Sequence, residues 1–158
     1  MNPIKPLLCA ALSAACIPAN AHETHQRTAM TTAQTHTVES RYSFAQTVQR
    51  LHAAVTERGM TVFAVIDHQA AAQKDGLSMQ PATVIVFGTP KAGTPLMVKD
   101  PAFALQLPLR VLVTETDGKV QVVYPSTRAL IQNSRIDYAD VENTLAKAET
   151  LIRNTVTQ

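Results

Sequence analysis

Two stretches made almost entirely of apolar residues constrain the fold of this chain more than any other feature. They occupy residues 62–66 and 84–87 and read Val-Phe-Ala-Val-Ile and Val-Ile-Val-Phe. Short apolar runs rich in β-branched and aromatic residues are typical of buried strands. A strand with one wet face alternates apolar and polar residues instead. The two runs therefore predict a sheet from which water is excluded on both faces.

The two long helices are predicted from capping residues and apolar spacing. Ser43 and Gln46 form a capping box that opens the first helix, and Gly59 suits the left-handed position after its last turn. Its buried face should carry apolar residues spaced three or four apart, namely Phe44, Val48, Leu51 and Val55. The last helix should run from Tyr138 to about Val156. Its buried face should consist of Tyr138, Val141, Leu145, Ala148 and Ile152.

Strands and short helical turns account for most of the remaining chain. Strands are expected at residues 38–42, 61–67, 83–87, 109–116 and 119–124. Asp117-Gly118 marks a two-residue hairpin turn between the last two strands. Residues 88–94 should form a loop. Short helical segments are expected over Ala70–Ala72 up to Gly76, and at Thr94-Pro95 and Asp100-Pro101.

This order of elements predicts an α+β fold, a two-layer β-α-β(4)-α sandwich. A five-stranded, mostly antiparallel sheet should carry the two main helices on one face. A second subunit would cover the other apolar face, which predicts a homodimer. The alternative is that the short helices and the connection 92–107 cover that face within one chain.

The N-terminal 21 residues have the features of a secretory signal peptide. Lys5 precedes an apolar core at residues 7–17 that is too short to span a membrane, and Ala19-Asn20-Ala21 is a cleavage motif. The mature chain would start at His22 and be periplasmic or secreted. The alternative is a lipoprotein acylated at Cys16. A polar, disordered lead-in at residues 22–37 should precede one domain at residues 38–158.

Composition excludes several classes of protein. The chain has 2 cysteines, Cys9 and Cys16, and both lie in the signal peptide, so the mature chain has no disulfide, thiol nucleophile or thiolate metal site. Loss of Lys5 leaves 13 of the 14 basic residues against 12 acidic ones. This balance, without a basic run, indicates no nucleic-acid partner. No other apolar stretch of the sequence is long enough to span a membrane either.

Several uncommon strings occur in order, at residues 47–51, 59–63, 66–71, 76–77, 87–91, 93–97 and 107–112. Together they resemble the bacterial family called domain of unknown function 302. The resemblance implies a compact α+β domain, often dimeric, with a layout like that of the TATA-binding protein, and it implies no established activity. Thr89 stands where this family usually has Asn, which puts any ligand contact by an amide there in doubt.

Asp67 and His68, at the end of the second strand, are candidate catalytic residues. A carboxylate and an imidazole can act as a general base or as metal ligands. Adjacent residues on a strand point to opposite faces, so they pair only if the strand ends there. The structural alternative is that Asp67 caps the following helix.

The segment 88–94 is a candidate anion site. Gly88 lets the backbone approach a ligand, Lys91 supplies positive charge, and Thr89 and Thr94 supply donors. The segment is not a P-loop, because the Gly-Lys-Ser/Thr ending is missing. A structural turn is the alternative.

Arg110 and the new N-terminus complete the candidates. Arg110 lies within the apolar run 107–113, where an unpaired charge is unfavourable. Asp67 is a candidate ion-pair partner, and an outward-facing arginine is the alternative. The α-amino group and imidazole of His22, with His25, could chelate Cu(II).

The leading hypothesis is an exported, dimeric module that binds a small anionic or apolar ligand near the ends of the second and third strands. The alternatives are an enzyme that uses His68 as acid or base, a structural or partner-binding protein, and a copper-binding protein. The sequence names no cofactor and no reaction.

Overall fold

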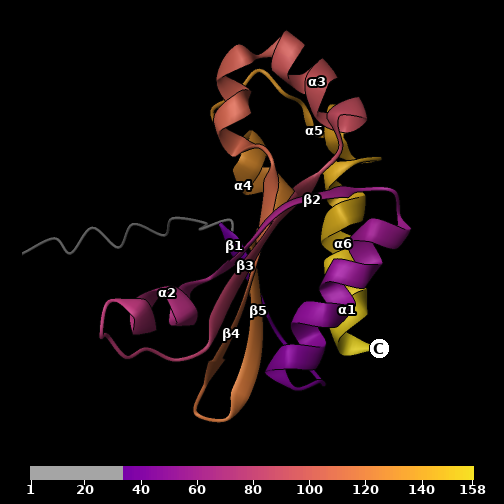
Figure 1. Cartoon of the computed structure of the whole chain (residues 1–158). Coiled ribbons are helices and arrows are strands. Elements are labelled where there is room, and N and C mark those ends of the chain that lie inside the picture. Colours follow the sequence, from indigo (N-terminus) through magenta and orange to yellow (C-terminus); the bar gives the residue numbers. More distant parts are fainter. Residues whose placement is uncertain (1–33) are drawn as a thin grey trace, which may run out of the picture. The chain divides into compact units, whose positions relative to one another are not determined.

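Five strands form one sheet in the order β1-β5-β4-β3-β2, and every neighbouring pair is antiparallel (Figure 1). The structure is a computed structural model, and it describes residues 34–158. The predicted α+β fold with a five-stranded sheet is confirmed. The strands are β1 (Thr35–Glu39), β2 (Thr61–Asp67), β3 (Ala82–Gly88), β4 (Leu109–Thr116) and β5 (Lys119–Pro125).

The helices fall into two long ones and several short ones. Among the described residues, α1 and α6 are the longest, and a 3-10 helix, η1, follows α3. The helices are α1 (Phe44–Glu57), α2 (His68–Lys74), α3 (Pro90–Lys99), η1 (Pro101–Gln106), α4 (Thr127–Ile131), α5 (Tyr138–Val141) and α6 (Leu145–Thr157).

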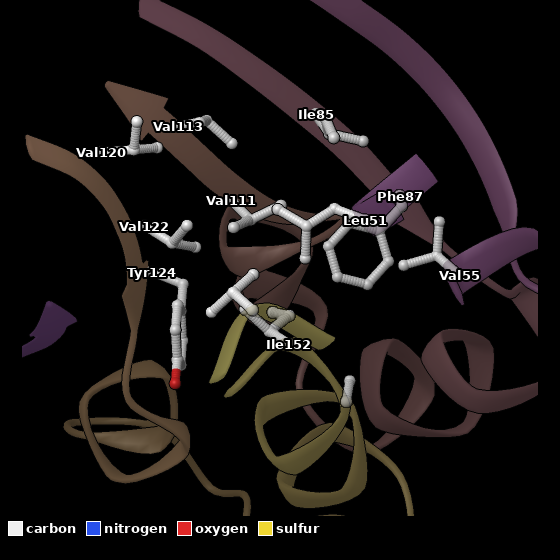
Figure 2. Close-up of a cluster of buried hydrophobic side chains, with 12 residues drawn as sticks. Leu51, Val55, Ile85, Phe87, Val111, Val113, Val120, Val122, Tyr124 and Ile152 are labelled. Atoms are coloured by element: carbon white, nitrogen blue, oxygen red, sulfur yellow. The ribbon is translucent and has the colours of Figure 1, made fainter. Parts of the chain in front are cut away.

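Helices α1 and α6 lie side by side against one face of the sheet (Figure 1). Both the capping box of Ser43 and Gln46 and the left-handed Gly59, with φ +72°, are as predicted. The helices bury aliphatic side chains against the central strands, as Figure 2 shows. The core comprises Leu51, Val55, Ile85, Phe87, Val111, Val113, Val120, Val122, Tyr124, Ala148, Ile152 and Val156. Burial of these side chains, at about 25 cal/mol per Å² of apolar surface, holds the two layers together.

The outer edge strand is more exposed than the sequence predicts. Phe63, Val65 and Ile66 of β2 are 54%, 49% and 43% exposed. Within a single chain, β2 is therefore not dry on both faces among the described residues. The reason is topological: β2 forms one edge of the sheet, whereas the two long helices bury the inner faces of the strands between the edges.

The first strand begins earlier than predicted. β1 starts at Thr35, whereas residues up to 37 were expected to belong to a disordered lead-in and the strand was expected at 38–42. Pairing with β5 explains the difference, because residues 35–39 align with residues 121–125. The polar composition of residues 34–37 conceals a strand whose partner lies far along the chain. The predicted hairpin at Asp117-Gly118 is confirmed, with φ +53° and +73°.

The single C-terminal helix predicted from Tyr138 is two helices, α5 and α6. Thr144 separates them with φ −127° and ψ −84°, which is not helical. The break still leaves Val141 and Leu145 buried, but Tyr138 is exposed rather than part of the buried face. Arg128 stacks over the Tyr138 ring instead, 4.8 Å from its centroid. Helix α4, capped by Ser126, was not predicted.

Candidate ligand-binding site

The antiparallel pairing of β2 with β3 separates the residues that were expected to share one crevice. Thr61 pairs with Gly88, and Asp67 pairs with Thr83. A seven-residue strand is about 20 Å long at about 3.4 Å per residue. Asp67 therefore lies at the opposite end of the sheet from Gly88, and helices α2 and α3 occupy these two ends (Figure 1). The prediction that Asp67 and Gly88 lie in one crevice is therefore wrong.

Asp67 has the structural role that the sequence offered as the alternative to catalysis, namely helix capping. Its Oδ1 accepts a hydrogen bond of 2.9 Å from the backbone N–H of Ala70 and so caps α2. His68 is the first residue of that helix and is exposed. Neither residue is part of the lining of the cavity described next or of the second hollow beside Arg110.

A cavity of about 490 Å³ lies at the other end of the sheet, and we call it the α3–α6 cleft. Its walls come from the start of β2, the start of α3, the turn into β4 and the start of α6. The apolar wall includes Met60, Phe63, Met97, Leu107, Leu109 and Leu151. The polar lining consists of Arg58, Thr89, Thr94, Asn143, Thr144 and Lys147. Ligand pockets of about 300–1,000 Å³ with mostly apolar walls are typical of small-molecule sites.

Three of the five predicted ligand-binding residues line this cleft, and two do not. Gly88, Thr89 and Thr94 are part of its wall. Lys91 is exposed on α3 outside the cleft. Arg110 is exposed in β4, opposite Val86, and lines a second hollow with polar neighbours such as Gln106. It forms no ion pair with Asp67 in the described structure.

The predicted loop at residues 88–94 is mostly helix. Thr89 precedes α3 and Pro90 takes its first position, so Pro95, which was expected to start a helical turn, lies inside the helix. Proline at the first position has the φ angle of a helix already. Buried Gly93 lets α3 approach the wall of the cleft, because a Cβ there would lie 3.1 Å from Leu107 Cδ1. The predicted turn at Asp100-Pro101 is confirmed as η1.

The cleft carries positive charge that the sequence reasoning missed. Arg58 follows the last residue of α1, and Lys147 lies in the first turn of α6. Both are exposed, and neither forms an ion pair with another residue of the segment 34–158. No Asp, Glu or His of that segment lines the cleft. A cation next to a helix-ending glycine was the only signal in the sequence for Arg58, and Lys147 had none.

A model of the family described as "Domain of unknown function DUF302" matches residues 36–152. The chain belongs to this family. The match includes both the cations and the apolar wall of the cleft, so the α3–α6 cleft lies within the DUF302 domain.

A solved structure supports the DUF302 fold. The crystal structure of an uncharacterized conserved DUF302 protein from Bacillus stearothermophilus superposes with a TM-score of 0.66. The alignment covers 78% of this chain and 96% of that one, at 18% sequence identity. At this identity the likeness establishes the fold alone.

Curated relatives share part of the chain. Proteins named fluoride-specific ion channel FluC 1 from Brucella suis and FluC 2 from Brucella melitensis are each 44% identical over 86 residues. The matches cover 54% of this chain but 34% and 32% of the relatives. The chain thus spans about a third of their length. Within residues 34–158, none of the helices has the length and apolar character needed to cross a membrane.

The titratable groups with shifted pKa values lie outside the cleft. Burial raises the pKa of Tyr124. The hydrogen bond with Asp140 raises the pKa of Lys99, and the same bond lowers the pKa of Asp140. Glu149, whose pKa is lowered by its hydrogen bonds despite its burial, also lies outside the cleft. In residues 34–158 no three potential metal ligands gather, and the candidate copper ligands His22 and His25 lie outside the described residues.

Proposed function

We propose that this DUF302 protein is an exported module that binds a small, mostly apolar molecule in the α3–α6 cleft. The cleft itself carries the proposal, because it combines a volume of about 490 Å³ with a mostly apolar wall. Burial of apolar surface contributes about 0.8 kcal/mol for each methylene group of a ligand, so a wall of this kind supports binding without any charged contact. Gly88, Thr89 and Thr94 form part of the same wall.

Export is supported by the N-terminal sequence. Lys5, the apolar core at residues 7–17 and the cleavage motif ending at Ala21 together favour secretion through a cleaved signal peptide. A periplasmic or secreted location would place the cleft where small molecules enter or leave the cell envelope.

A homodimer is supported by the edge of the sheet. β2 is an edge strand with three exposed apolar side chains and no lysine or proline, which are the usual protections against pairing. Antiparallel pairing of β2 with β2 of a second copy would satisfy its outer backbone groups and cover Phe63 and Val65. Such pairing is isologous, as twofold symmetry requires.

The curated relatives are named fluoride-specific ion channels, whereas we propose ligand binding for this chain. The shared segment is about a third of each relative. Fluoride is therefore a competing ligand in the displacement experiment, so that the ion in the relatives' names is tested on this protein directly.

The proposed function is tested with the neutral fluorescent dye N-phenyl-1-naphthylamine and purified mature protein. The dye should bind wild-type protein with saturable fluorescence. Ala92→Leu fills the cleft from α3, where Ala92 lines it, and should weaken binding. Ala139→Leu makes the same change at an exposed position of α5 outside the cleft and should leave binding intact. Equal dye affinity in both variants would refute binding in the cleft.

A further inference from the structure

The sign of the charge around the α3–α6 cleft points to a ligand class, and the inference rests on the function proposed above. Arg58 and Lys147 are the charged residues that line the cleft, and both are basic. No carboxylate of the described segment lines the cleft or neutralises either cation through an ion pair. An apolar cleft with uncompensated positive charge complements an amphiphile with a negative head.

Two other cations near α3, Lys99 and Arg135, are paired with carboxylates of the chain itself. Lys99 of α3 contacts two carboxylates, 2.5 Å from Asp140 and 3.3 Å from Asp137. Arg135 lies 3.9 Å from Asp100. Arg58 and Lys147 have no such partner among residues 34–158, so their charge is available to a bound molecule.

The magnitudes decide which kind of anion fits. Arg58 and Lys147 are exposed, and a contact between exposed charges changes an affinity only about two- to fivefold. Each buried methylene group raises an affinity about fourfold. Inorganic anions would gain only the first contribution, whereas an amphiphile of six to ten carbons would gain both. The cleft therefore favours a molecule whose apolar body supplies affinity and whose head selects the sign.

We infer that the α3–α6 cleft binds a free monocarboxylate with an alkyl or aryl body. The body lies against Met60, Phe63, Leu107 and Leu109, and the carboxylate faces Arg58 and Lys147. A single negative head is sufficient, because Arg58 and Lys147 are both exposed and neither is a buried charge that requires a partner.

The inference is tested by displacement of bound N-phenyl-1-naphthylamine from mature protein. Octanoate should displace the dye more strongly than 1-octanol or octyltrimethylammonium of the same chain length. Lengthening the chain from hexanoate to octanoate should strengthen displacement. Sodium phosphate and sodium fluoride should not displace the dye.

The decisive variant removes both cations. Arg58→Gln with Lys147→Gln should weaken octanoate roughly three- to tenfold and leave 1-octanol within about twofold of wild type. Lys91→Gln with Arg110→Gln removes equal charge outside the cleft and should leave both ligands unchanged. Circular dichroism verifies that each variant is folded.

The possible failures are distinguishable. If the dye binds in the cleft but octanol competes as well as octanoate, the inference is overturned while the proposed function stands. Charge-dependent displacement by phosphate or fluoride alone would overturn it in favour of an inorganic anion. If the dye does not bind wild-type protein, and octanoate gives no heat of binding by calorimetry, both the inference and the proposed function fail.

Discussion

Nε2 of His36 in β1 lies 2.6 Å from Oε1 of Glu149 in α6. The other carboxylate oxygen of Glu149 accepts hydrogen bonds from the backbone N–H and the hydroxyl of Thr127, at 2.9 and 2.7 Å. One side chain thus ties the first strand and the start of α4 to the last helix. The His36 ring also packs against Tyr124, with centroids 5.4 Å apart. This connection orders a segment whose composition alone predicts disorder.

Replacement of Glu149 should make stability less dependent on pH. Burial raises the pKa of Glu149, but hydrogen bonds from Thr127 and the adjacent His36 outweigh burial and hold it below the ordinary value of 4.5. A carboxyl with a lowered pKa stabilises the fold above its unfolded-state value, and this contribution is lost as the pH falls through the folded-state value. Glu149→Gln should therefore cost about 1–2 kcal/mol at pH 7 in urea unfolding, and clearly less at pH 3.

The matched control for that experiment is Glu57→Gln. Glu57 is the exposed last residue of α1, and its side chain forms no hydrogen bond or ion pair with another described residue. It should unfold like wild type at both pH values. If Glu149→Gln lowers the free energy of unfolding by the same amount at pH 7 and at pH 3, the assigned role of the carboxylate is contradicted.

Gly93→Ala should narrow the cleft rather than unfold the protein. The added Cβ would lie 3.1 Å from Leu107 Cδ1, and Leu107 lines an open cavity into which it can move. The gain in helix propensity, about 1 kcal/mol, offsets the crowding. The free energy of unfolding should stay within about 1 kcal/mol of wild type, while dye affinity falls about fourfold, as expected for one displaced methylene contact.

Gly88→Ala serves as its comparison. A Cβ at Gly88 would meet Pro108 at 3.7 Å and Phe63 at 3.8 Å, which are ordinary contacts. No neighbour has to move, so thermal unfolding should not occur at a lower temperature than in wild type. If Gly93→Ala lowers stability by several kcal/mol, Leu107 is fixed, and the wall of the cleft is more rigid than we expect.

Val65→Lys should convert the proposed dimer into a monomer. Val65 is 49% exposed in β2, so the substitution should alter the stability of the folded subunit by no more than about 0.5 kcal/mol. A lysine on the unpaired edge disfavours strand pairing. Size-exclusion chromatography with light scattering should give a dimer for wild type and a monomer for the variant. Thr37→Lys, on the opposite edge strand, should remain dimeric, and a monomeric wild type would remove the proposal.

Expression of the full chain in a bacterial host should yield a protein that begins at His22. The cleavage motif ends at Ala21, and cleavage would remove both cysteines. Intact-mass spectrometry of the periplasmic fraction measures the start directly. Cys16→Ser should not alter the mass of the mature product. A lipid-modified species that starts at residue 16 would favour the lipoprotein alternative instead.

Elements with local signals could be predicted from the sequence. The capping box at Ser43, the apolar spacing in α1, and the Asp117-Gly118 hairpin are set by residues within one or two turns of each other. Because such interactions form within a short segment, the residue pattern of that segment predicts them before the fold is known. A mostly antiparallel sheet could also be predicted, because the elements and their order restrict how the strands can pair; in the structure every neighbouring pair is antiparallel.

The position of the site was decided by the tertiary structure. The sequence predicts that the polar residues at the ends of β2 and β3 share one crevice. Antiparallel neighbours end at opposite ends of the sheet, however, so Asp67 and Gly88 are separated. Arg58 and Lys147 lie far apart in the chain and meet at one cleft because α1 and α6 pack side by side against the sheet. Helix caps and turns depend on residues that are neighbours in the sequence, whereas the cleft forms only where segments distant in the sequence pack together.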